Sequence, residues 1–116
     1  MKLAIVGSRT FNDYGLLGET IWQHFSICKD KLEIVSGGAK GADSFGADFA
    51  ENWNLRCTVY PPEWDKYGKP AGFIRNQTIV DNCDMVLAFW DGRSKGTQDT
   101  INKAKKAKKP TFIVYF

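Results

Sequence analysis

Met1-Lys2-Leu3-Ala4-Ile5-Val6-Gly7-Ser8-Arg9, residues 1–9, is the stretch that decides the fold class. Leu3 to Val6 form a continuous apolar run, which is typical of a strand buried on both faces of a parallel sheet. The turn Gly7-Ser8-Arg9 follows directly. The stretch therefore predicts a first strand over residues 2–7, with a glycine, a hydroxyl and a guanidinium at its carboxyl end.

Outward from this strand, short apolar strands alternate with amphipathic helices. Further strands are predicted over residues 32–36, 56–60, 84–90 and 111–116. Helices are predicted over residues 13–30, after Asp43 with Phe45, Phe49 and Trp53 on the inner face, over 73–83 with Ile74, Ile79 and Val80 inward, and over 97–109. Residues 61–72 contain three prolines and two glycines, and predict a structured loop.

The alternation predicts a three-layer, Rossmann-like α/β fold with a parallel sheet built from βαβ units. Five strands connected in this way most simply give the order 3-2-1-4-5, with all strands buried. The connections reverse between strands one and four, and ligands of such sheets bind at the carboxyl ends of the strands there. We expect residues 1–116 to form a single domain.

Composition excludes several classes of protein. With 43% hydrophobic and 25% charged residues, the chain is expected to be globular. Its longest apolar run, Met85–Trp90, is too short to span a bilayer, and the first strand is too short for a signal peptide, so a cytoplasmic protein is expected. Cys28, Cys57, Cys83 and the lone His24 form no ligand pattern, so we expect no disulfide, metal or cofactor.

The net charge of +3 has one local source. Five lysines near the end of the last predicted helix supply more than the whole excess, so the rest of the chain carries a net charge of −2: Lys103, Lys105, Lys106, Lys108 and Lys109. Cations in the last turns of a helix complement its dipole. We interpret them as a solvated face and do not expect a nucleic-acid partner, since no aromatic residues are interleaved.

Three glycine-containing turns follow strands at or beside the switch point: Gly7-Ser8-Arg9, Ser36–Asp43 and Asp91–Thr97. One such turn alone often serves tight packing, whereas three at one edge favour a ligand. We expect unpaired backbone N–H groups of these turns to gather there and hold a phosphate. The candidate ligand-binding residues are Gly7, Ser8, Arg9, Ser36, Gly37, Gly38, Lys40, Gly41, Asp43, Trp64, Arg75, Asn76, Asp91, Ser94, Gly96 and Thr97.

Several of these residues have two interpretations. Trp64 or Tyr67 stacks on a base, or Trp64 anchors its loop to the sheet edge. Asp43 binds ribose, or it caps its helix. Arg75 binds a phosphate through its planar fork, or it forms a surface ion pair with an aspartate of the same region, Asp81 or Asp84.

Two common nucleotide-binding classes are disfavoured. The first turn lacks the pattern GxGxxG, and no acidic residue ends the second strand. A standard NAD-dependent dehydrogenase is therefore not expected. The lysine pattern of a P-loop NTPase is also absent.

A series of motifs occurs in a fixed order along the chain. They are Gly7-Ser8-Arg9 with Phe11 and Asp13, Ser36-Gly37-Gly38-Ala39-Lys40-Gly41-Ala42-Asp43, Pro62-x-Trp64, Tyr67-Gly68-Lys69, Ala71-Gly72, Arg75-Asn76, and Ala88-Phe89-Trp90-Asp91-Gly92-x-Ser94-x-Gly96-Thr97. Together they resemble the YspA/YpsA-related branch of the SLOG superfamily, which is related to the LOG phosphoribohydrolases and to DprA. The resemblance spans nearly the whole chain. It implies a Rossmann-like fold that binds nucleotides or nucleotide-derived ligands, such as ADP-ribose-like signals, and a homodimer or higher homo-oligomer.

The chain departs from the LOG enzymes at one position. Their motif PGGxGTxxE ends in a glutamate that acts with an arginine, which Arg75 matches, whereas Thr100 stands where the glutamate would fall. Asp99 points about 100° away on a helix. Whether Glu63 or Asp43 substitutes is left open by the spacing. We therefore expect a sensor or sequestering protein that binds without turnover, with LOG-like hydrolysis of nucleoside monophosphates as the alternative and DprA-like binding of single-stranded DNA as the third hypothesis.

Overall fold

The computed structural model describes residues 1–25 and 31–116. Its five parallel strands form one sheet in the order β3-β2-β1-β4-β5, which confirms the predicted fold class and strand order. The strands are β1 (Lys2–Gly7), β2 (Glu33–Ser36), β3 (Arg56–Val59), β4 (Met85–Trp90) and β5 (Thr111–Tyr115). The helices are α1 (Tyr14–Phe25), α2 (Ala42–Asn52), α3 (Trp64–Tyr67), α4 (Ala71–Asp81) and α5 (Lys95–Lys106).

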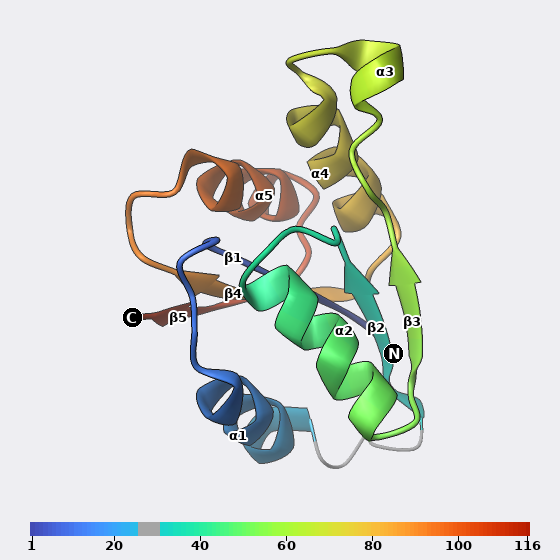
Figure 1. Cartoon of the computed structure of the whole chain (residues 1–116). Coiled ribbons are helices and arrows are strands. Elements are labelled where there is room, and N and C mark those ends of the chain that lie inside the picture. The colour runs from blue at the N-terminus through green and yellow to red at the C-terminus, as the bar shows by residue number, and fades with distance from the viewer. Residues whose placement is uncertain (26–30) are drawn as a thin grey trace.

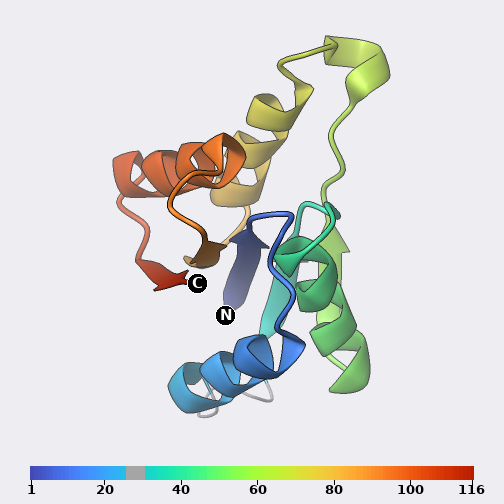
Figure 2. The ribbon, with the colours of Figure 1, turned by 60° about the vertical axis from the view of Figure 1, so that its left-hand side comes forward.

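The sheet lies between two layers of helices (Figures 1 and 2): α1 and α2 cover one face, and α4 and α5 cover the other. Alternate residues of β1 point to opposite faces, so one strand serves two cores. Leu3 and Ile5 pack toward α1 and α2, and Ala4 and Val6 pack toward α4 and α5. Each of these four side chains is at most 4% exposed. This explains why the run is apolar throughout.

Some predicted positions in the core are wrong. All residues of β3 are exposed, because this strand forms the sheet edge. Trp53 follows the end of α2 and is 48% exposed, although its ring meets that of Trp22 edge-on at 4.6 Å. Ile74 is 38% exposed because Ile79 and Val80 occupy the inner face of α4.

Several element boundaries also differ from the prediction. The predicted loop 61–72 contains α3 and the first two residues of α4. Pro70 is the N-cap residue of α4, and a proline is tolerated at the start of a helix. Helix α5 begins at Lys95, two residues before the predicted start, and ends at Lys106, well before Pro110. The predicted end of the first helix and Cys28 lie outside the described residues.

Within the described ranges, Cys57 and Cys83 are free thiols. The described residues contain no cluster of side chains suited to a metal ion. No helix among them is long and apolar enough to cross a membrane.

Two glycines inside helices give opposite predictions for stability. A Cβ at Gly46 of α2 would lie 2.7 Å from the Cβ of Ile5, so α2 sits directly on β1. We expect Gly46→Ala to lower the free energy of unfolding by about 1–3 kcal/mol through overpacking. At Gly18 of α1 the nearest atom would lie 4.0 Å away, so Gly18→Ala is expected to raise the free energy by about 0.5–1 kcal/mol. Urea unfolding of both variants measures the contrast, and equal effects would contradict the packing described.

Candidate functional site

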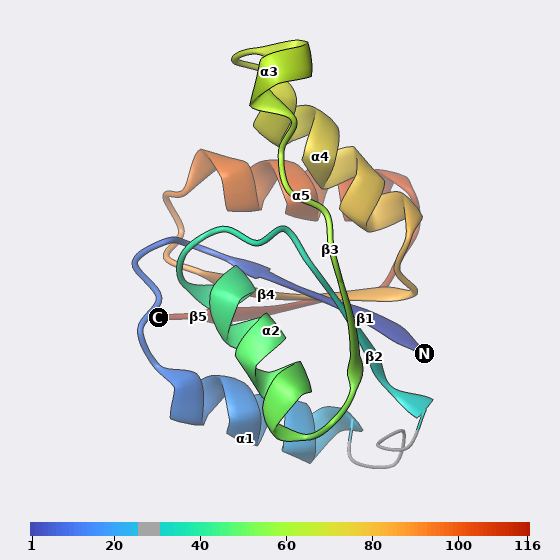
Figure 3. The same ribbon diagram turned by 45° about the vertical axis from the view of Figure 1, so that its right-hand side comes forward.

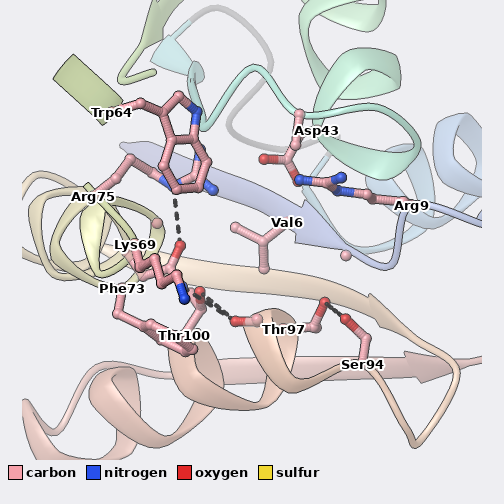
Figure 4. A pocket seen from close by; sticks show the side chains of 15 residues that line it. Val6, Arg9, Asp43, Trp64, Lys69, Phe73, Arg75, Ser94, Thr97 and Thr100 are labelled. Atoms are coloured by element: carbon pink, nitrogen blue, oxygen red, sulfur yellow. Dashed lines mark hydrogen bonds between the residues drawn. The ribbon is translucent and has the colours of Figure 1, made fainter. Parts of the chain in front are cut away.

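A pocket of about 290 Å³ lies at the carboxyl ends of β1 and β4, the predicted switch point of the sheet (Figure 4). The turn after β1, the turn after β2, the α3–α4 segment and the first turns of α5 enclose it. Its lining residues are Val6, Gly7, Arg9, Ala39, Asp43, Trp64, Lys69, Gly72, Phe73, Arg75, Asn76, Ser94, Gly96, Thr97 and Thr100.

The pocket takes in only part of the predicted set. The candidate residues that line it are Gly7, Arg9, Asp43, Trp64, Arg75, Asn76, Ser94, Gly96 and Thr97. The candidates outside its lining are Ser8, Ser36, Gly37, Gly38, Lys40, Gly41 and Asp91. All three predicted turns still reach this edge of the sheet, since each contributes at least one lining residue.

Asp43 is the buried charge of the site. Asp43 lies in the first turn of α2 and is only 5% exposed. The N-cap residue of α2 is Gly41, and no side chain caps the helix. Burial raises the pKa of Asp43 to about 6, against the opposing effects of the Arg75 guanidinium and of hydrogen bonds from the backbone amides of Ala39, Gly37 and Gly7. The carboxylate thus joins the turns after β1 and β2 and does not cap its helix.

Arg75 of α4 faces the same centre. Its Nη1 donates to the Gly37 carbonyl at 2.7 Å, and its Nε donates to Oδ1 of Asn76 at 3.0 Å. Burial lowers the pKa of Arg75, Asp43 raises it, and the charge of Arg9 lowers it. The predicted alternative of a surface ion pair is therefore wrong. A Cβ at Gly37 would lie 2.5 Å from Nη1 of Arg75 and 2.6 Å from Oδ2 of Asp43, so any larger residue here would displace these two charged groups.

Several amides of the first two turns have partners within the protein. Besides the three amides at Asp43, the Ser8 amide donates to the Phe89 carbonyl at 2.9 Å, and the Gly38 amide donates to Oγ of Ser36 at 3.2 Å. The hydroxyl of Ser8 accepts from the Asp91 amide at 3.3 Å. The prediction of unpaired amides is therefore wrong for Gly7, Ser8, Gly37, Gly38 and Ala39. For the other amides of these two turns, from Arg9 and from Lys40 to Asp43, no acceptor is recorded among the described residues. Ser8 and Ser36 stabilise the turns.

The first turn of α5 leaves free amides at the pocket. In the part of the chain that the structure describes, the backbone N–H groups of Lys95, Gly96 and Thr97 have no hydrogen-bond acceptor, and the N-cap Ser94 makes no side-chain cap. Its hydroxyl lies 3.2 Å from that of Thr97 instead. Asp91 accepts from the amides of Arg93 and Ser94, which lowers its pKa, but not from the helical ones. Such a helix start favours an anion.

The cationic side chains near this edge of the sheet differ in whether they line the pocket. Arg9 is an exposed lining residue, whereas Lys40 is exposed outside the pocket. Six further residues line the pocket that were not among the candidates predicted from the sequence: Val6, Ala39, Lys69, Gly72, Phe73 and Thr100. Helical spacing would have found Thr100, which lies three residues after Thr97 on the same face. Lys69 and Phe73 fall in and just after the proline-rich stretch, where no periodicity indicates direction.

A polar network ties α4 to α5 beneath the pocket. Asn76 donates to the Gly96 carbonyl at 3.2 Å and to Oδ2 of Asp99 at 3.1 Å. Lys103 donates to the same Asp99 oxygen and to the Phe73 carbonyl, both at 2.6 Å. Asp99 is therefore engaged between the helices and does not line the pocket.

Comparison with known proteins identifies the family. The model of the YAcAr family, described as the YspA, cpYpsA-related SLOG family, matches residues 1–67. The chain belongs to this family. Across nearly its whole length it is also similar to the Gene 61 protein of Mycobacterium phage D29, with 32% identity over 112 residues, 91% of this chain and 90% of that protein.

Solved structures share the fold of this SLOG-family chain. DNA processing protein A (DprA) from Streptococcus pneumoniae matches with a TM-score of 0.76 and 22% identity over 97% of this chain, which spans only 49% of that protein. DprA from Helicobacter pylori, described with a single-stranded DNA binding mode, matches with a TM-score of 0.70 and 24% identity over 97% of this chain and 64% of its own. TM1055, a structural genomics target, matches with a TM-score of 0.69 and 18% identity over 95% of this chain and 71% of its own.

The buried carboxylate predicts a pH-dependent stability. A folded-state pKa of about 6 against 3.8 means that the folded protein holds this proton more tightly. The stability that Asp43 contributes is therefore fully present below pH 3.8 and is lost as the pH rises through 6. The shift corresponds to about 3 kcal/mol in the free energy of unfolding. In Asp43→Asn this part of the pH dependence should disappear.

Urea unfolding between pH 4 and pH 7.5 measures the effect as the difference in pH dependence between wild type and variant. Asp48→Asn, an exposed carboxylate on the same helix, provides the control and should keep the wild-type dependence. Parallel curves for wild type and Asp43→Asn would show that Asp43 titrates normally.

Proposed function

We propose that this pocket binds the phosphate of a small nucleotide or nucleotide-derived ligand at the first turn of α5. The observation that carries the proposal is the set of N–H groups of Lys95, Gly96 and Thr97, which lack acceptors within the described residues and lie at a pocket that Arg9 also lines. A helix start with free amides, at a pocket that a guanidinium also lines, is a suitable site for phosphate. The SLOG family and the Rossmann-like fold support a nucleotide-type ligand.

The proposed role is that of a sensor or sequestering protein, without turnover. Thr100 occupies the position of the LOG glutamate, and its hydroxyl donates to the Gly96 carbonyl at 3.3 Å. The carboxylate of Asp43 lines the pocket but is held by three backbone amides and lies near Arg75. Neither group is arranged as a free acid for a departing base. Prolonged incubation with AMP should therefore release no adenine, and release that stops in Arg75→Ala would establish the hydrolase alternative instead.

Single-stranded DNA is the second candidate, because the H. pylori structure with this fold is described as binding it. The lysines at the end of α5 do not all remain available for such a partner. Lys103 pairs with Asp99, and Lys109 donates to the carbonyls of Val80 and Cys83, whereas Lys105 and Lys108 are exposed. DNA binding through this face would show steep salt dependence and disappear in the double variant Lys105→Glu/Lys108→Glu.

Ligand binding itself gives the next prediction. We expect at least one of AMP, ADP-ribose, cyclic ADP-ribose isomers, NAD and cyclic dinucleotides to raise the melting temperature, because a ligand that binds only the folded state stabilises it. Arg9→Ala should weaken that ligand about tenfold, since it removes one charged hydrogen-bond donor. Lys40→Ala removes an exposed cation outside the pocket and should leave the affinity unchanged.

Differential scanning fluorimetry identifies the ligand, and calorimetric titration compares the variants. A folded protein whose melting temperature no compound shifts at millimolar concentration would contradict the proposal. Equal losses in Arg9→Ala and Lys40→Ala would place the phosphate elsewhere.

A further inference from the structure

Trp64 is a large apolar side chain that the folded protein leaves uncovered. It begins α3, the four-residue helix that projects beyond the rest of the molecule (Figure 3), and it is 53% exposed. The described structure records no hydrogen bond from its indole N–H, whereas the indole of Trp90 donates to the Ser94 carbonyl at 3.0 Å. Exposing this much aromatic surface is unfavourable unless something covers it.

The indole ring lies at the pocket and not on the sheet edge. Trp64 lines the pocket, and its Cη2 lies 3.8 Å from where a Cβ of Gly72 would stand, at the start of α4. Phe73, also half-exposed, lines the pocket beside it. Contact with the first turn of α4 therefore replaces the predicted anchoring to the sheet.

The pocket has two chemically different ends. Figure 4 shows Trp64 and Phe73 on one side, and Arg9 with Ser94 at the start of α5 on the other. Arg75 lies behind Trp64 in this view, and Asp43 lies beside Arg9. A ligand that fills the pocket thus meets an aromatic surface on one side, where Lys69 and Arg75 also lie. On the other side it meets the start of α5, and Arg9 lines the pocket there too.

We propose that the pocket takes a mononucleotide whose base stacks on Trp64 while its phosphate lies at the start of α5. This inference rests on the proposed function and narrows its ligand class. A cavity of about 290 Å³ is at the small end of ligand pockets, so it suits one base, one sugar and one phosphate better than a dinucleotide. Stacking tolerates any base, because every base has a π-face, so Trp64 distinguishes ligands with a base from ligands without one.

The experiment compares two ligands that share the phosphate but differ in the base. Calorimetric titrations use a nucleoside monophosphate, taken from AMP, GMP, CMP and UMP as the one that binds best, and ribose 5-phosphate. Trp64→Ala should weaken the nucleotide about tenfold or more and leave ribose 5-phosphate unchanged. Trp64→Phe keeps an aromatic face and should restore most of the affinity.

Tyr67→Ala supplies the matched control, because Tyr67 is an exposed aromatic residue of the same helix that does not line this pocket. It should bind both ligands as the wild type does. Circular dichroism and the melting temperature confirm that each variant is folded.

The possible failures are distinguishable. If Trp64→Ala weakens both ligands equally, or neither, the stacking role is overturned while phosphate binding stands. If the wild type binds ribose 5-phosphate as tightly as every nucleotide, the base makes no contact and the inference fails alone. If the wild type binds no phosphate ligand at all, the proposed function and the inference fail together.

Discussion

A buried carboxylate in the first turn of α2 holds this edge of the sheet together. Asp43 interacts with the backbone amides of Gly7, Gly37 and Ala39, and with the guanidinium of Arg75. It thus connects the end of β1, the turn after β2 and helix α4 at the carboxyl edge of the sheet. Ionising so buried a group is unfavourable, which the raised pKa expresses. The protein tolerates this because three amides that would otherwise lack partners are satisfied.

Because of this constraint, the glycine turns have different structural roles. In the turns after β1 and β2, the amides nearest the strand ends donate to Asp43, to the Ser36 hydroxyl and to the Phe89 carbonyl, so they fix the geometry of the turns. The turn after β4 uses Asp91 to stabilise its own loop and leaves the first amides of α5 without an acceptor in the described structure. Since Asn76 binds the Gly96 carbonyl, the same helix that carries Arg75 also positions this start. A preorganised site of this kind binds an anion with little reorganisation.

The fold was predictable because its signals are local. The unbroken apolar runs of β1 and β4 and the periodic helices between strands specify a parallel sheet, and the handedness of its connections leaves few strand orders. Position at the sheet edge is not a local signal. No strand pairs with the outer side of β3, so the burial inferred from the pattern of a parallel strand did not hold there.

The site was predictable only to the level of which turns reach it. Glycine spacing identified the turns, and the family resemblance drew attention to Trp64, Arg75 and Asn76, which line the pocket. Spacing did not reveal that Asp43 would occupy the amides of two turns, because that depends on how α2 and α4 meet in space. For the same reason Lys40, adjacent in sequence, points to solvent, while Lys69, in a stretch without periodicity, lines the pocket.

Amide-resolved NMR titration with the best-binding nucleotide tests the central claim most directly, because it reports on each backbone N–H separately. The largest shifts are expected for Lys95, Gly96 and Thr97, with a second change at the Trp64 indole and little change at Gly38 or Lys40. Shifts concentrated on the lysines at the end of α5, or on the turn after β2, would contradict the assignment of the phosphate to the start of α5.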